Sequence, residues 1–135
     1  MISRLDILEG ITARNVPHST EVLKKSKVAI AGLGGLGSNI AVMLARIGVG
    51  HLFLVDFDVV EPSNLNRQHY NTTHIGMRKT EALKSQLELI NPFVRIETMN
   101  VKINEKKADN ELNGRQEDKE LKFAADFALL PKVIN

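Results

Sequence analysis

The apolar positions of the chain follow two patterns that together predict a parallel α/β sheet. Residues 28–31 and 52–55 are short, uninterrupted apolar runs, as expected of parallel strands that are covered on both faces. Between them, apolar residues at spacings of four and three predict a helix that begins at Gly37 and ends at Gly48. The stripe expected to face the sheet is Ile40, Leu44 and Ile47. Together, these two strands and the helix between them are predicted to form one right-handed crossover unit.

The segments on either side of this unit extend the same pattern. Residues 1–27 are typical of a mostly helical lead-in. Residues 57–75 are rich in Asn, Thr, His and Pro and show neither period, which predicts a long ordered loop, and such loops are usually functional. Residues 76–90 predict a second helix with a stripe of Leu83, Leu87 and Ile90, stopped by Asn91 and Pro92, and residues 93–103 predict a third strand.

The pattern predicts a domain over residues 1–104 and a divergent, charged segment over residues 105–135. With 135 residues, 43% of them apolar, one compact domain is expected. No apolar stretch reaches the roughly 20 residues that cross a bilayer, so we expect a cytoplasmic protein with no membrane partner. The net charge of +2 is small and dispersed, which argues against a nucleic-acid partner.

The absence of cysteine excludes a disulfide, a thiolate zinc site and a cysteine nucleophile. The four histidines have no ligand spacing with carboxylates, so we predict no zinc and name no metal ligand. They are His18, His51, His69 and His74, of which His51 is expected only to start a strand.

A glycine-rich turn joins the first predicted strand to its helix. Its glycines are Gly32, Gly34, Gly35 and Gly37. Glycine is needed where the backbone approaches a phosphate, and the helix N-terminus that follows attracts an anion. Asp56, at the end of the next strand, is placed to bind ribose hydroxyls. The pattern predicts a nucleotide site and by itself would suggest NAD; the alternative is that the glycines serve only close helix packing.

The stretch VDFDVVEPSNLNRQ, from residue 55 to residue 68, favours ATP over NAD. It adds Asp58, Asn64, Arg67 and Gln68 beside the turn, and Lys79 follows in the first turn of the next helix. Two fixed cations beside a phosphate-binding turn suit a triphosphate. Structural alternatives remain: Asp58 could pair with Arg67, the asparagines could make side-chain turns, and Lys79 could be a solvated lysine.

At these residues the chain resembles the ThiF/MoeB/HesA branch of the ubiquitin-activating-enzyme-like superfamily. The resemblance covers about residues 20–104 and rests on GLGGLGSN, VDFDxVExSNLNRQ and the GxxK that follows. It implies a Rossmann-like fold and adenylylation, with ATP and Mg²⁺, of the C-terminal glycine of a ubiquitin-like sulfur carrier protein, as in thiamine biosynthesis.

The resemblance also implies a role for each matching residue. Asp56 would hold the ribose, and Asn64, Arg67 and Lys79 would contact the phosphates, with Arg67 and Lys79 as the catalytic cations. Gln68 would shape the pocket. In a homodimer, Arg14 would reach the ATP of the partner subunit.

The chain departs from the family pattern after the third strand. The family's fourth strand, its magnesium-binding aspartate and its carrier-binding region have no clear counterpart, and Asp126 is the only acid near the right place. Without a fourth strand, residues 28–31 would form a sheet edge.

Three explanations are open: a truncated or frame-shifted copy, which we favour, a natural half-domain that pairs with a partner, or FAADFALL as an unusual fourth strand. The rival functions are a non-catalytic nucleotide- or carrier-binding protein and an NAD-binding oxidoreductase module. The pattern does not specify the carrier or its pathway.

Overall fold

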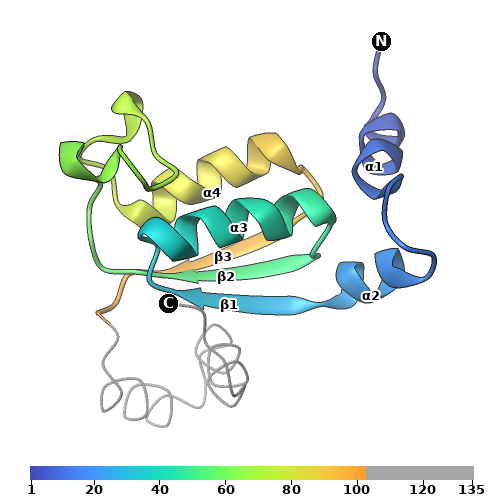
Figure 1. Cartoon of the computed structure of the whole chain (residues 1–135), viewed down its shortest axis with the longest axis horizontal. Coiled ribbons are helices and arrows are strands. Elements are labelled where there is room, and N and C mark those ends of the chain that lie inside the picture. The colour runs from blue at the N-terminus through green and yellow to red at the C-terminus, as the bar shows by residue number, and fades with distance from the viewer. Residues whose placement is uncertain (103–135) are drawn as a thin grey trace, which may run out of the picture.

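The computed structural model describes residues 1–102, which form a parallel sheet with two long helices over one of its faces (Figure 1). The elements are α1 (Arg4–Thr12), α2 (Ser19–Lys25), β1 (Lys27–Ala31), α3 (Gly35–Ile47), β2 (His51–Val55), α4 (Lys79–Ile90) and β3 (Arg95–Met99). Two 3-10 helices, η1 (Pro62–Asn64) and η2 (Thr72–His74), lie in the loop between β2 and α4. The α/β fold class and the order of elements are as the sequence predicts.

The three strands are parallel and pair in the order β1-β2-β3. Lys27 is paired with His51, and His51 with Arg95, so the carboxyl ends of the strands meet at one edge of the sheet. Within residues 1–102, β2 is the one strand that pairs with β1, as expected for a sheet edge. Asp126, FAADFALL and the predicted tail of residues 105–135 lie outside the described residues.

The main core lies between the sheet and the two crossover helices. Leu52 and Leu54 of β2 pack there with Ile30 of β1. From α4 come Leu83 and Leu87, as predicted, with Ile90 half-buried at the margin. Burial of such side chains is worth roughly 1.5–3 kcal/mol each, so this layer fixes the positions of both helices on the sheet.

The predicted stripe of α3 is partly wrong. The side chains that α3 buries most deeply include Ala41, Val42 and Ala45, whereas Ile40 and Leu44 are half-buried and Ile47 is 43% exposed. The small residues let the helix approach the sheet closely, and its larger apolar side chains lie on the flanks of the contact. The end of α3 is as predicted, since Gly48 caps the helix with a φ of 98°.

The loop between β2 and α4 is ordered, as the sequence predicts. Besides η1 and η2, it contains an antiparallel bridge between Val59 and Arg78. Val60 and Tyr70 from this loop are buried in the main core. None of the helices in residues 1–102 is long and apolar enough to cross a membrane.

Candidate functional site

The glycine turn lies at the carboxyl edge of the sheet, where β1 meets α3. Gly32 follows β1 with a φ of 88°, a conformation that favours glycine. A Cβ on Gly37 would overlap the carbonyl oxygen of Gly32, so the helix can lie this close to the turn only without a side chain. Gly34 caps α3, and Gly35 is its first residue. The four predicted glycines therefore form one turn at a helix N-terminus.

Asp56 is tied to this turn through its carboxylate. Its Oδ2 accepts a hydrogen bond from the backbone N–H of Leu33 (2.6 Å), and its Oδ1 accepts one from the N–H of Asp58 (2.7 Å). A carboxylate offers about four acceptor positions, so both oxygens can accept further bonds from a ligand. Asp56 thus helps to fix the turn and keeps capacity for hydroxyl donors.

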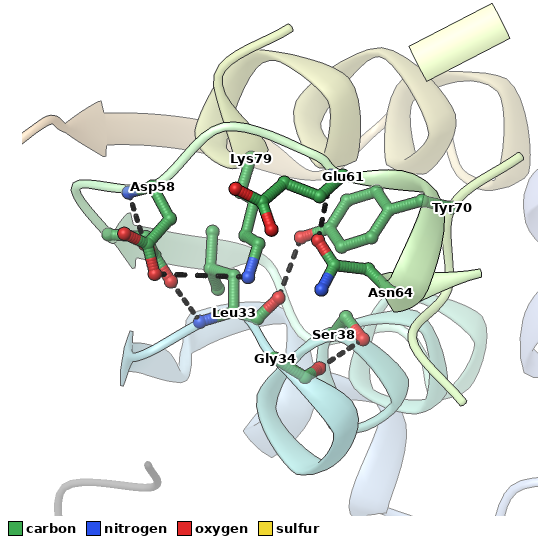
Figure 2. A network of polar contacts seen from close by, with 9 residues as sticks. Leu33, Gly34, Ser38, Asp58, Glu61, Asn64, Tyr70 and Lys79 are labelled. Atoms are coloured by element: carbon green, nitrogen blue, oxygen red, sulfur yellow. Dashed lines mark hydrogen bonds and ion pairs between the residues drawn. The ribbon is translucent and has the colours of Figure 1, made fainter. Parts of the chain in front are cut away.

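Lys79 places a buried ammonium beside the turn. It is the first residue of α4, and its side chain is only 8% exposed. Figure 2 shows the side chain reaching into the polar network with its nitrogen directed to Asp58, whose Oδ2 lies 4.0 Å away. Asp58 is itself 70% exposed, and no shorter ion pair or hydrogen bond of this ammonium is found within residues 1–102.

A charge so placed is costly. It is largely removed from water, its counterion within residues 1–102 is an exposed carboxylate 4.0 Å away, and it lies at the helix end that repels cations. The alternative of a solvated lysine is therefore wrong. The arrangement has the chemistry of an anion site.

Arg67 and Gln68 lie directly against the glycines. The aliphatic stem of Arg67 would be 3.6 Å from a Cβ on Gly35, and the carboxamide of Gln68 would be 3.7 Å from one on Gly34. The guanidinium donates to Asn66 Oδ1 (3.1 Å) and to the carbonyl of Ser63 (3.4 Å). Asp58 thus pairs with Lys79, and the alternative pairing with Arg67 is wrong.

Gln68 also carries a buried acceptor. Its Oε1 has no hydrogen-bond partner among residues 1–102. Unpaired buried polar atoms are uncommon, and at a candidate site they point to a ligand.

Asn64 makes a local side-chain turn, as the structural alternative for the asparagines predicts. Its Oδ1 accepts from the N–H of Glu61 (2.8 Å) and so caps η1. The side chain is buried at the inner side of the loop, close to the labelled Glu61 and Tyr70 in Figure 2. This bond uses the oxygen and leaves the amide nitrogen for other partners.

Three residues that sequence reasoning missed join the loop to the turn. The Tyr70 hydroxyl donates to the carbonyl of Leu33 (2.7 Å), and Asn39 Nδ2 donates to the carbonyl of Arg67 (3.0 Å). Ser38 Oγ accepts from the N–H of His69 (3.0 Å). The signal that could have found Tyr70 is its uniqueness, since it is the one tyrosine of the chain and lies two residues after the NRQ motif.

Two predicted features remain, the arginine of the lead-in and a metal site. Arg14 is exposed between α1 and α2. No group of three His, Asp or Glu side chains able to hold a metal is found within residues 1–102. Near the turn, the Asp56 carboxylate accepts from two N–H groups and Asp58 pairs with the ammonium of Lys79.

Known proteins are similar to this chain in sequence. The model of the ThiF family matches residues 10–121, a range that extends on both sides of residues 20–104. Molybdopterin-synthase adenylyltransferase from Haemophilus influenzae is 50% identical over 88 residues, which are 64% of this chain and 36% of that protein. Ubiquitin-like modifier-activating enzyme 5 from Drosophila persimilis is 41% identical over 100 residues, which are 74% of this chain and 26% of that protein.

The fold is similar to that of a solved E. coli enzyme. The crystal structure of tRNA N6-threonylcarbamoyladenosine dehydratase in complex with ATP matches with a TM-score of 0.72 and 26% identity. The match covers 87% of this chain and 49% of that one. The chain thus spans about a quarter to a half of the length of these three proteins.

Proposed function

Because this chain belongs to the ThiF family, we propose that it provides the nucleotide-binding part of an ATP-dependent adenylyltransferase. The proposed acceptor is the C-terminal carboxylate of a ubiquitin-like carrier protein. Relatives named as an adenylyltransferase and as a ubiquitin-like modifier-activating enzyme support this reaction class. A structural neighbour in complex with ATP supports the choice of nucleotide.

The observation that carries the proposal is the buried ammonium of Lys79 at the same sheet edge as the glycine turn. Its partner Asp58 is 70% exposed and lies 4.0 Å away, so solvent weakens the pairing that offsets the burial of this charge. A bound triphosphate would supply the missing negative charge. Arg67, packed against Gly35, adds a second cation at the first turn of α3.

The proposed roles follow from these positions. Asp56 would accept hydrogen bonds from the ribose, and Arg67, Lys79 and the open N–H groups of the turn would contact phosphates. Asn64 would contribute its amide nitrogen, and Gln68 would line the pocket. Magnesium would enter with ATP as part of the substrate.

The chemistry needs little help from a protein base. A carboxylate oxygen of the carrier attacks the α-phosphorus of ATP, the bond from this phosphorus to the bridging oxygen breaks, and pyrophosphate leaves. The product is an acyl-adenylate. Because a carboxylate is already a nucleophile, the chain's task is to position the phosphates and offset their charge, which fixed cations and N–H dipoles can do.

Within this class we propose a sulfur carrier as the partner, acted on in the cytoplasm by a homodimer. The relative named for molybdopterin synthase favours this choice. The thiamine and molybdopterin pathways are both compatible with it.

Isothermal titration of the folded chain with MgATP and with NAD tests the nucleotide. We expect ATP to bind more tightly, and Arg67→Ala to weaken ATP binding at least tenfold, since a charge-assisted contact is worth about 1.5–3 kcal/mol. Arg46→Ala is the matched control. Arg67 packs against the first residue of α3, whereas Arg46 is an exposed arginine in the last turn of that helix. It should change ATP affinity less than twofold.

Tighter binding of NAD, or equal loss of ATP affinity in both arginine variants, would contradict the assignment. Pyrophosphate exchange with an added carrier then separates the enzyme from its main rival. ATP binding without exchange would identify a non-catalytic binding protein.

A further inference from the structure

The peptide between Leu33 and Gly34 is held from one side by the loop. The Tyr70 hydroxyl donates to the Leu33 carbonyl over 2.7 Å, and both residues are buried. The Leu33 N–H, in the preceding peptide, is bound to Asp56. Side chains therefore bind both backbone polar groups of Leu33, and Figure 2 shows the bond from Tyr70 that reaches across from the loop.

This contact sets the direction of a different group, the N–H of Gly34. In a trans peptide the carbonyl and the following N–H point in opposite directions. When Tyr70 holds the Leu33 carbonyl on the loop side, the Gly34 N–H must point to the other side. Gly34 is half-buried, and its N–H has no acceptor among residues 1–102.

Without the hydroxyl, this orientation would be weakly determined. Glycine at position 34 allows wide rotation about its backbone bonds, so the peptide could turn its N–H away. Burial raises the pKa of Tyr70 above its ordinary value, and the negative charge of Asp56 raises it further. The hydroxyl therefore remains a donor at neutral and mildly alkaline pH.

We propose that Tyr70 is a positioning residue for the nucleotide: it orients the Gly34 N–H toward a phosphate oxygen while it touches neither phosphate nor substrate. This inference rests on the proposed function only for the choice of nucleotide, because it holds for any ligand that brings a phosphate to the turn. It assigns the tyrosine a role in phosphate affinity beyond its packing in the core.

The test compares two ligands in Tyr70→Phe, which keeps the ring and removes the hydroxyl. Titration calorimetry should show MgATP binding about tenfold weaker, the effect of one lost or misaligned hydrogen bond to a charged group. Adenosine, which has no phosphate, should bind within twofold of its wild-type affinity. A residue that only stabilises the fold would not separate these ligands.

Asn91→Ala is the matched control. Asn91 also donates from a buried side chain to a backbone carbonyl, that of Ala45 (2.8 Å), but near the opposite end of α3. It should lower the urea midpoint of unfolding and leave both affinities unchanged. Unchanged ATP affinity in Tyr70→Phe, or equal losses for ATP and adenosine, would overturn the inference.

If Tyr70→Phe does not fold, the wild-type chain provides the second measurement. It contains one tyrosine, so growth on 3-fluorotyrosine labels Tyr70 alone. The fluorine resonance should move on addition of ATP and stay in place with adenosine; no movement with ATP would overturn the inference.

The two proposals can fail separately. If wild-type chain binds NAD in preference to ATP, the proposed function fails, and the Tyr70 comparison is made with NAD against adenosine. If it binds neither nucleotide, both proposals are wrong.

Discussion

The two ends of α3 use the same glycine geometry for different purposes. Each end has a glycine with positive φ, Gly32 at 88° and Gly48 at 98°. Each also has a glycine where a Cβ would overlap a backbone carbonyl: Gly37 meets Gly32, and Gly50 meets Lys24. By conformation and close contact, the two turns are nearly equivalent.

Their hydrogen bonds distinguish them. At the C-terminal end, the N–H groups of Gly48, Val49 and Gly50 donate to backbone carbonyls of Ala45, Leu44 and Leu23. At the N-terminal end, the Gly34 N–H has no acceptor within residues 1–102, and a buried ammonium lies at the same sheet edge. In this chain both ends of α3 need glycine for close packing, and an open N–H donor beside a buried, weakly paired charge distinguishes the end that we propose as the ligand site.

The strongest test of this comparison replaces the two close-contact glycines in turn. Gly37→Ala and Gly50→Ala should each lower the free energy of unfolding by about 3 kcal/mol, because each added methyl overlaps backbone. In urea unfolding the two variants should therefore look alike. Only Gly37→Ala should also abolish ATP binding by calorimetry under conditions where both variants are folded. Loss of ATP binding in folded Gly50→Ala would remove the distinction between the two ends.

A second test concerns the charge of Lys79, near the N-terminal end of α3. Lys79→Met should weaken ATP binding about 30-fold, corresponding to ~2 kcal/mol for a charge-assisted contact. Its free energy of unfolding should equal or exceed that of the wild type, because a buried, poorly paired ammonium is lost. Lys84→Met, on the same helix, is the control and should change neither quantity. A less stable Lys79→Met with normal ATP affinity would make Lys79 structural.

The smallest expected effect is a pH dependence of stability near the C-terminal end of α3. His51 follows Gly50 and is buried beside Glu97, whose Oε2 lies 3.3 Å from His51 Nε2. Burial lowers the pKa of His51 below its ordinary value of 6.5, although Glu97 opposes this shift. Protonation therefore favours the unfolded chain, so this contribution to stability is present above pH 6.5 and declines as the pH falls below it.

Urea unfolding at several pH values from 7 down to 5 measures this slope. His51→Gln should reduce the slope relative to the wild type, and ATP affinity at pH 7 should be unaffected in this variant. A steeper slope in His51→Gln would mean that protonation of His51 stabilises the folded chain, which is the opposite sign.

Much of the fold could be predicted because its signals are local. The apolar runs at residues 28–31 and 52–55 and the glycine at position 48 each determine one element or boundary. The orientation of α3 was less predictable. Large apolar side chains suggested the Ile40, Leu44 and Ile47 stripe, but a helix drawn close to a sheet buries small residues such as Ala41 and Ala45.

For the candidate site, the sequence predicted which residues gather at one sheet edge and did not predict their contacts. The motif identified Asp56, Arg67, Gln68 and Lys79, and the structure brings each of them to the glycine turn or to its sheet edge. The motif could not reveal that Asp56 accepts from the N–H of Leu33 or that the Tyr70 hydroxyl donates to the carbonyl of the same residue. Such bonds depend on how the loop folds back over the turn, which no local spacing encodes.

The order of pairing in the sheet bears on how the chain can fold during synthesis. Each strand pairs with the next one made, β1 with β2 and β2 with β3. The first pair can therefore form, with α3 and the glycine turn between its strands, before α4 has left the ribosome. The cations at residues 67 and 79 emerge later. The topology thus permits a nascent chain to build the backbone half of its site first and to complete it with side chains as translation proceeds.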